Sequence, residues 1–258
     1  MLLWQREKIK PLHCIDITAI TGLSYISGDD DVIRIGGLTS LSQIERTDLQ
    51  DPYLITLVSV ARLMATQQTR TIATIAGNLC NASPAGDFIP PLIALGAYLV
   101  LVGENGSREI PLEQFMVGPG KTCLQHSELL TEICIPLPPR ARASSYRRID
   151  RTVVDIALVS AAGAVTLNSD HTVKDVKITL GAVAPTVIRS KAAETMLKGV
   201  ALSTVSAEFL QEVGNVAARD ATPISDVRAS AEYRTAMTRV LVRRVLEDIV
   251  HSLAEEAQ

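Results

Sequence analysis

Apolar and polar residues alternate in several short runs of the first half of the chain, the pattern of β-strands that bury one face. Runs at residues 15–26 and 32–35 flank a triplet of aspartates that predicts a solvated turn. Residues 97–102 and 108–110 flank an Asn-Gly pair, which is typical of a tight hairpin. Residues 129–135 form another such run. The first half is therefore predicted to hold several short strands.

Helical spacing of apolar residues appears between these runs. Thr39 or Ser40 is a candidate cap for a short helix through Glu45, and residues 54–65 have apolar positions three and four apart. Another helix is predicted to start near Asp87. The segment between the last two is predicted to be an irregular crossing.

A proline-rich stretch at residues 136–139 separates this half from a second pattern. Antiparallel strands are predicted at residues 156–164, 176–180 and 182–188. Helices are predicted at residues 192–197, 204–218 and 231–254. The last helix has one apolar stripe, which we interpret as core packing. The pattern predicts an α+β fold with domains at 1–137 and 141–254.

Composition narrows the class of protein. The 258 residues are 47% hydrophobic and 21% charged, as expected of a chain that buries a core. A net charge of −3 gives no electrostatic basis for binding nucleic acid or an anionic membrane. The most apolar stretch, residues 88–102, contains two prolines and is shorter than the roughly 20 residues that span a bilayer. Because no secretory signal is apparent, we predict a cytoplasmic protein.

The cysteines and histidines do not form a ligand pattern. The spacing of Cys14, Cys80, Cys123 and Cys134 matches neither zinc nor iron–sulfur motifs, and the four histidines are far apart in sequence. The chain also lacks hydrolase and P-loop motifs. We therefore predict no metal site and no catalytic residue of its own.

Candidate chemistry concentrates in residues 73–87, ATIAGNLCNASPAGD. Gly77 and Asn78 are candidates for positive-φ turns that point backbone N–H groups at an anion. Asn78, Asn81 and Ser83 can donate and accept hydrogen bonds, while an ionised Asp87 only accepts. This set suits a ligand with phosphates and hydroxyls, although its composition is equally typical of an ordinary loop.

This run resembles the flavin motif A-T-x-G-G-N-(I/L)-x-x-A-S-P-x-x-D of the FAD-binding subunits of molybdenum hydroxylases, the xanthine dehydrogenase and carbon monoxide dehydrogenase family. Further matches follow in the same order over nearly the whole chain. They lie at residues 34–39, 118–122, 128–136, 146–148 with Asp155, 183–186 and 226–234.

The resemblance implies an FAD-binding domain followed by a C-terminal domain of the CO dehydrogenase flavoprotein type. It places residues 73–77 along the phosphates and ribityl chain, and Leu129 or Leu130 over an apolar part of the cofactor. Tyr146 either covers the flavin or faces the core from a strand. Arg147 or Arg148 either stabilises negative charge on reduced flavin or is solvated at the surface. The implied cofactor-binding residues are Ala73, Thr74, Ile75, Ala76, Gly77, Asn78, Asn81, Ser83, Asp87, Leu129, Leu130, Tyr146 and Arg148.

The resemblance also implies partners: a molybdopterin-binding large subunit and a small subunit with two two-iron two-sulfur clusters. The chain would then carry FAD and pass electrons from the clusters to an external acceptor. A scaffold subunit that has lost flavin is the main alternative. A flavin reductase related to cell-wall precursor reductases is a weaker one, because the matches continue beyond residue 139.

Two departures from the family pattern affect the expected affinity for FAD. Ala76 stands where the family has a glycine. The first residues, from Met1 to Glu7, resemble the segment that follows the family's N-terminal A-G-G-T-D-like loop, so the sequence is expected to lack that second phosphate cradle. We therefore expect these 258 residues to bind FAD weakly or to be recovered without it, while the second domain stays folded.

Overall fold

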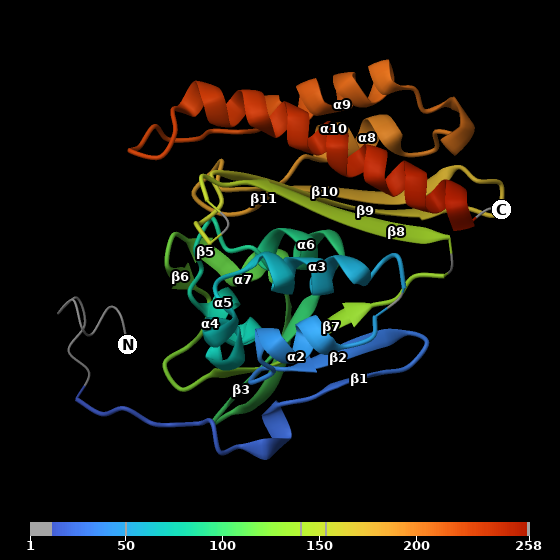
Figure 1. Cartoon of the computed structure of the whole chain (residues 1–258). Helices are drawn as coiled ribbons and strands as arrows, with labels where there is room; N and C mark the ends of the chain where they lie inside the picture. The colour runs from blue at the N-terminus through green and yellow to red at the C-terminus, as the bar shows by residue number, and fades with distance from the viewer. Residues whose placement is uncertain (1–11, 50, 140, 153, 257–258) are drawn as a thin grey trace.

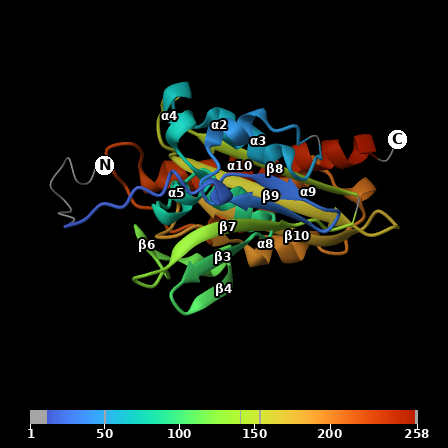
Figure 2. The same cartoon turned by 90° about the horizontal axis from the view of Figure 1, so that it is seen from below.

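The computed structural model describes residues 12–49, 51–139, 141–152 and 154–256. Two antiparallel sheets form separate layers, with short helices between them and the C-terminal helices above the upper sheet (Figure 1). The start of the described chain and the end of its last helix lie at opposite ends of the molecule (Figures 1 and 2). This arrangement confirms the predicted α+β class and the antiparallel sheet predicted for the C-terminal half.

The lower sheet has the strand order β1-β2-β7-β3-β4. Its strands are β1 (Ile26–Gly28), β2 (Val32–Gly36), β3 (Tyr98–Gly103), β4 (Gly106–Pro111) and β7 (Leu129–Pro136). Ile35, Ile133 and Leu99 lie side by side across three strands and are fully buried, so their face of the sheet carries the core. A separate two-stranded ribbon pairs β5 (Met116–Gly118) with β6 (Lys121–Thr122).

Short helices cover the buried face of this sheet. They are α2 (Leu41–Arg46), α3 (Ile55–Leu63), α4 (Gln67–Ile72), α5 (Ile75–Cys80), α6 (Ile89–Ala94) and α7 (Leu112–Phe115). The single turn η1 (Thr21–Leu23), before β1, has no buried residue. The predicted cap of α2 is Ser40, whose hydroxyl accepts from the Gln43 N–H while the Gln43 side chain accepts from the Ser40 N–H.

The upper sheet has the order β11-β10-β9-β8. Its strands are β8 (Arg142–Ile149), β9 (Val159–Leu167), β10 (Val173–Gly181) and β11 (Ile188–Arg189). The helices above it are α8 (Lys191–Leu197), α9 (Ala207–Arg219) and α10 (Ala231–Glu256), with the single turn η2 (Leu202–Thr204) before α9. Every residue of β9 is buried, because α6 packs on one side of the sheet and α10 on the other. Gly163 of β9 permits the close packing of α10 on the sheet, since a Cβ at this position would lie 2.9 Å from the Val245 side chain.

The two sheet units share part of one core. Tyr146, Ala162, Ala164 and Val187 of the upper unit belong to the buried cluster formed by the lower sheet and its helices. The predicted boundaries at residues 137 and 141 remain predictions. None of the described helices combines the length and apolar character needed to cross a bilayer.

Most predicted elements are confirmed, including the β3–β4 hairpin, β7, α3 and α10. The strand predicted at residues 15–26 is wrong apart from Ile26, because Ile15 is 84% exposed and its alternation has no core to face. The strand predicted at 182–188 is also wrong. Ala182 adopts φ +61° and ends β10, and only Ile188 pairs again in β11. The predictions about Met1 to Glu7 lie outside the described residues.

Candidate functional site

The flavin motif begins as a capped helical turn. The Thr74 hydroxyl accepts a hydrogen bond from the Gly77 N–H at 3.0 Å, and α5 follows from Ile75. Ile75 and Leu79 are fully buried and anchor this helix to the core. The Ile75 N–H donates to the Thr39 carbonyl at 3.2 Å, which ties the motif to residues 34–39.

This helix corrects two expectations about the motif. Residues 75–80 are helical rather than irregular, and neither Gly77 nor Asn78 has a positive φ. The left-handed residue is Ala82, with φ +46°, where the chain leaves α5. Ala76 is helical and 8% exposed, so its methyl group packs toward the core instead of straining the backbone. The Thr74 cap was the missed signal, because a threonine three residues before the Gly77 N–H favours a helix start.

Asn78 carries an unsatisfied acceptor. Its Oδ1 atom is buried and has no hydrogen-bond partner within the described part of the chain. A buried amide oxygen without a partner loses its hydration at a cost of about 1–3 kcal/mol, so this atom requires an explanation, and a bound ligand that donates to it is one. Gly77 beside it is exposed, and a Cβ there would meet only the Thr74 hydroxyl, at 3.0 Å. The motif therefore presents an acceptor and open backbone on one turn.

These features fit FAD. Its ribityl hydroxyls are donors that suit the Asn78 oxygen, and the exposed Gly77 lets a bulky ligand approach the backbone closely. Asn81 is exposed and Ser83 is half-buried, so polar side chains of the motif are accessible where the chain leaves α5.

Asp87, Tyr146 and Arg148 meet in a buried cluster that joins the two sheet units. The Tyr146 hydroxyl donates to Asp87 Oδ1 at 2.6 Å, and Arg148 Nη1 donates to Asp87 Oδ2 at 2.9 Å. Arg148 Nη2 also lies 2.9 Å from Asp150 and donates to the Leu63 carbonyl at 3.1 Å. Side-chain exposure is 4% for Arg148 and 9% for Asp87 in this pair. Asp87 is thus already paired by residues of β8.

The cluster keeps its protons fixed. Burial raises the pKa of Tyr146 well above its usual value, and the Asp87 charge raises it further, so the phenol stays a donor. Burial lowers the pKa of Arg148, but Asp87, with smaller contributions from Tyr146 and Asp150, raises it, and the net shift is upward. A neutral phenol and a charged guanidinium therefore share one carboxylate.

Arg147 points away from this cluster. It donates from Nε and Nη2 to Asp248 on α10 at 2.8 and 2.7 Å. Successive residues of a strand face opposite sides of a sheet. Arg148 therefore faces the flavin motif and Arg147 faces α10, which separates the two candidates.

Leu129 and Leu130 begin β7 beside the glycines of residues 34–39. Leu130 is 7% exposed and Leu129 is 46% exposed, so Leu129 offers the accessible apolar surface. A Cβ on Gly37 would lie 2.5 Å from the Leu130 carbonyl oxygen. This glycine is explained by close backbone packing between two strands.

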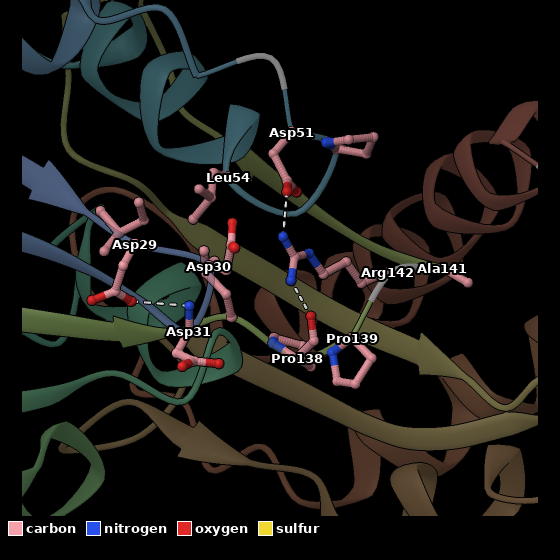
Figure 3. Close-up of a pocket in the computed structure, with 12 residues that line it drawn as sticks. Asp29, Asp30, Asp31, Asp51, Leu54, Pro138, Pro139, Ala141 and Arg142 are labelled. Carbon is pink, nitrogen blue, oxygen red and sulfur yellow. Dashed lines mark hydrogen bonds and ion pairs between the residues drawn. The ribbon is translucent and has the colours of Figure 1, made fainter.

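Two of the cavities in the described part of the chain lie at the junction of the sheet units. One, of about 760 Å³, lies between the β1–β2 turn and the start of β8, where Arg142 donates to Asp51 at 2.5 Å and to the Pro138 carbonyl (Figure 3). No predicted cofactor residue lines it. The other, of about 320 Å³, is lined by Ser83 and its neighbours together with loops of the C-terminal half.

Comparison with known proteins identifies the family. A family model described as the FAD binding domain in molybdopterin dehydrogenase matches residues 1–138, and one described as the CO dehydrogenase flavoprotein C-terminal domain matches residues 144–249. The chain belongs to the FAD-binding subunits of the molybdenum hydroxylases. It is an oxidoreductase subunit and its cofactor is FAD.

Individual relatives span most of this subunit. The carbon monoxide dehydrogenase medium chain of Hydrogenophaga pseudoflava is 31% identical over 92% of this chain and 81% of its own length. The xanthine dehydrogenase FAD-binding subunit of Escherichia coli O157:H7 is 28% identical over 95% of this chain and 84% of its own. The solved Hydrogenophaga pseudoflava carbon monoxide dehydrogenase matches with a TM-score of 0.89 and 31% identity, covering 96% of this chain and 85% of that one.

Proposed function

We propose that this subunit carries FAD within a molybdenum hydroxylase complex and passes electrons from iron–sulfur clusters to an external acceptor. Its partners in this proposal are a molybdopterin-binding large subunit and a two-iron two-sulfur small subunit. Support comes from its relatives, which are named as a medium chain and an FAD-binding subunit of dehydrogenases. The unpaired oxygen of Asn78 in the flavin motif supports it from the structure.

The motif supplies the residues that would hold the cofactor. The part of the motif proposed to lie along the phosphates and ribityl chain consists of Ala73, Thr74, Ile75, Ala76 and Gly77. Asn78, Asn81 and Ser83 add polar contacts, and Leu129 with Leu130 covers apolar surface. When bound, FAD would supply the redox chemistry, because a flavin can accept electrons and pass them on singly or in pairs.

Asp87, Tyr146 and Arg148 have a second role in this proposal. Their bonds of 2.6 and 2.9 Å fix the end of the motif against β8. Arg148 is nearly dry and is paired with both Asp87 and Asp150, so its charge is compensated within the cluster. The role of the cluster in this proposal is therefore to hold the motif in position. We therefore keep all three in the proposed cofactor site.

The observation that carries the proposal is the buried, unpartnered Oδ1 of Asn78. Asn78→Ala removes this acceptor without breaking a hydrogen bond of the flavin-free chain. We expect FAD binding to weaken by about 1–3 kcal/mol, the usual effect of a lost buried hydrogen bond. Asn215→Ala on α9 is the matched control, since among the described residues its side-chain amide bonds only to Glu212 and Gln211.

Fluorescence titration of FAD with the purified subunit measures both variants. The proposal predicts measurable binding by the unmodified chain, weaker binding by Asn78→Ala and an unchanged affinity for Asn215→Ala. Equal affinity in all three would show that the motif is structural only. Recovery of the native complex without flavin absorbance would favour the scaffold alternative.

A further inference from the structure

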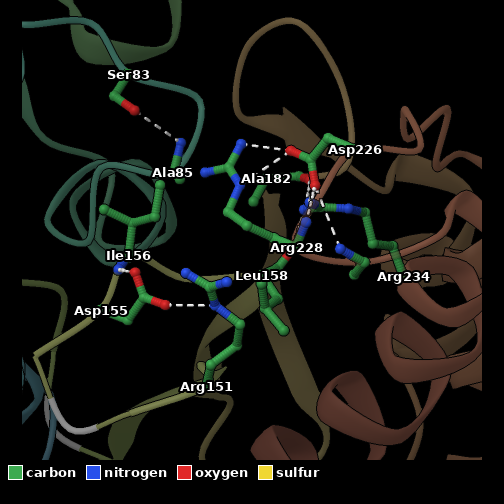
Figure 4. A network of polar contacts seen from close by, with 11 residues as sticks. Ser83, Ala85, Arg151, Asp155, Ile156, Leu158, Ala182, Asp226, Arg228 and Arg234 are labelled. Atoms are coloured by element: carbon green, nitrogen blue, oxygen red, sulfur yellow. Dashed lines mark hydrogen bonds and ion pairs between the residues drawn. The ribbon is translucent and has the colours of Figure 1, made fainter.

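Residues 226–234 approach the flavin motif from the far end of the chain. The 320 Å³ cavity has Ser83 and Ala85 on one wall and Ala182, Asp226 and Arg234 on the other (Figure 4). The motif loop and the loop before α10 are thus neighbours, although more than a hundred residues separate them in sequence.

Arg234 is the centre of this contact. Its side chain is 4% exposed, although it lies in the first turn of α10. Nη1 donates to the Leu158 carbonyl and, at 3.3 Å, to the Ala182 carbonyl. Nη2 donates to Asp226 Oδ1 at 2.9 Å. One guanidinium therefore joins α10, the start of β9 and the end of β10.

Asp226 holds this guanidinium in place. Its carboxylate also accepts from Arg228 Nε at 3.0 Å and from the backbone N–H groups of Arg228 and Ala229 at 2.9 and 3.2 Å. The bonds from Arg228, followed by those from Ala229 and Arg234, hold the pKa of Asp226 well below its usual range. The carboxylate is therefore a permanent anion, and it braces the loop as well as Arg234.

Ala182 transmits the contact to the flavin motif. It adopts φ +61°, a conformation that costs an alanine about 1–2 kcal/mol and persists only where surrounding bonds impose it. Its carbonyl accepts from Arg234, and its N–H donates to the Pro84 carbonyl at 2.7 Å. A continuous chain of hydrogen bonds thus runs from Asp226 through Arg234 and Ala182 to Pro84.

We propose that Asp226 and Arg234 are positioning residues for the flavin: acting through Ala182, they hold residues 83–85 in the conformation that receives FAD. This inference rests on the proposed function. It gives a role to Asp226 and Arg234, which belong to none of the predicted cofactor contacts. Disturbing the pair should loosen the motif and weaken FAD binding, although neither side chain belongs to the predicted cofactor contacts.

The test uses the full chain and two measurements. In the flavin-free chain, Asp226→Asn should speed hydrogen exchange of the Ala182 amide by about tenfold, because local opening no longer breaks a charged network. In the FAD titration it should raise the dissociation constant by about tenfold. Arg234→Lys, which keeps the charge but cannot reach three acceptors, should change both in the same direction and serves if Asp226→Asn does not fold.

Asp248→Asn is the matched control. Asp248 lies on the same helix and pairs with Arg147 and Ser145. These two residues lie on the face of β8 that faces α10, away from Asp87 and the flavin motif. It should leave the Ala182 exchange rate and the FAD affinity within about twofold of the unmodified chain.

Unchanged exchange at Ala182 in both variants would overturn the positioning role, whatever happens to FAD. Faster exchange with unchanged FAD affinity would also overturn it, because the hydrogen bonds from Asp226 to Pro84 would then stabilise the fold without affecting the cofactor. If the unmodified chain binds no FAD, the proposed function fails and the positioning role fails with it. Even in that case, the exchange rate of the Ala182 amide shows whether Asp226 and Arg234 stabilise the loop around Ala182.

Discussion

The carboxylate of Asp87 offers a quantitative test of how the two sheet units are joined. Asp87→Asn keeps the shape of the side chain but removes its charge. It loses the charge-assisted bond from Arg148, worth about 1.5–3 kcal/mol, and weakens the bond from the Tyr146 hydroxyl, worth about 1 kcal/mol. Arg148 retains Asp150 and the Leu63 carbonyl, so the guanidinium is not left isolated.

The expected loss is therefore about 2–3 kcal/mol, below the 3–5 kcal/mol for stranding a buried charge completely. Urea unfolding of the flavin-free chain measures it. Tyr146→Phe should cost about 1 kcal/mol, and the double variant should lose less than the sum, because both changes disturb one network. Asp170→Asn, in an exposed turn, is the control. A loss below about 0.5 kcal/mol for Asp87→Asn, the range of surface substitutions, would refute this account of the cluster.

Two further predictions concern packing and pH. Gly181→Ala should destabilise the chain by about 1–3 kcal/mol, because its Cβ would lie 2.3 Å from the Ser160 hydroxyl, and adding Ser160→Ala should restore part of the loss in thermal unfolding. The bond from Arg108 lowers the pKa of Glu128 to about 2 from 4.5, so its stabilisation is complete above pH 4.5 and fades as the pH falls toward 2. The difference in unfolding midpoint between the unmodified chain and Glu128→Gln should shrink over that range, and a constant difference would contradict the shift.

Helices and strands were predicted correctly where a local sequence signal coincided with a face that is buried in the core. The Asn-Gly hairpin and the apolar stripe of α10 are examples, since turn chemistry and helical periodicity both survive folding. The sequence failed at residues 15–26, where alternating residues have no partner layer. It also did not predict β8. Arg147 and Arg148 are adjacent charged residues that break the alternation of a strand, and they point to opposite faces of the sheet, where each pairs with a distant carboxylate.

The site was predictable only as a set of residue types. Family resemblance selected Asp87, Tyr146 and Arg148 separately, but only the fold shows that they bond to one another. The link from Asp226 to Pro84 was beyond reach, because it depends on a positive φ at Ala182 and on a buried arginine in an otherwise amphipathic helix. Neither feature leaves a local pattern in the sequence.

Purification of the tagged subunit from cells that produce its native partners tests the central claim most directly. Visible absorption, metal analysis and subunit identification are made on the same sample. The account predicts recovery with a molybdenum-binding large subunit and an iron–sulfur small subunit, with flavin absorbance in the complex. A complex without flavin, or a subunit recovered alone with reductase activity of its own, would contradict it.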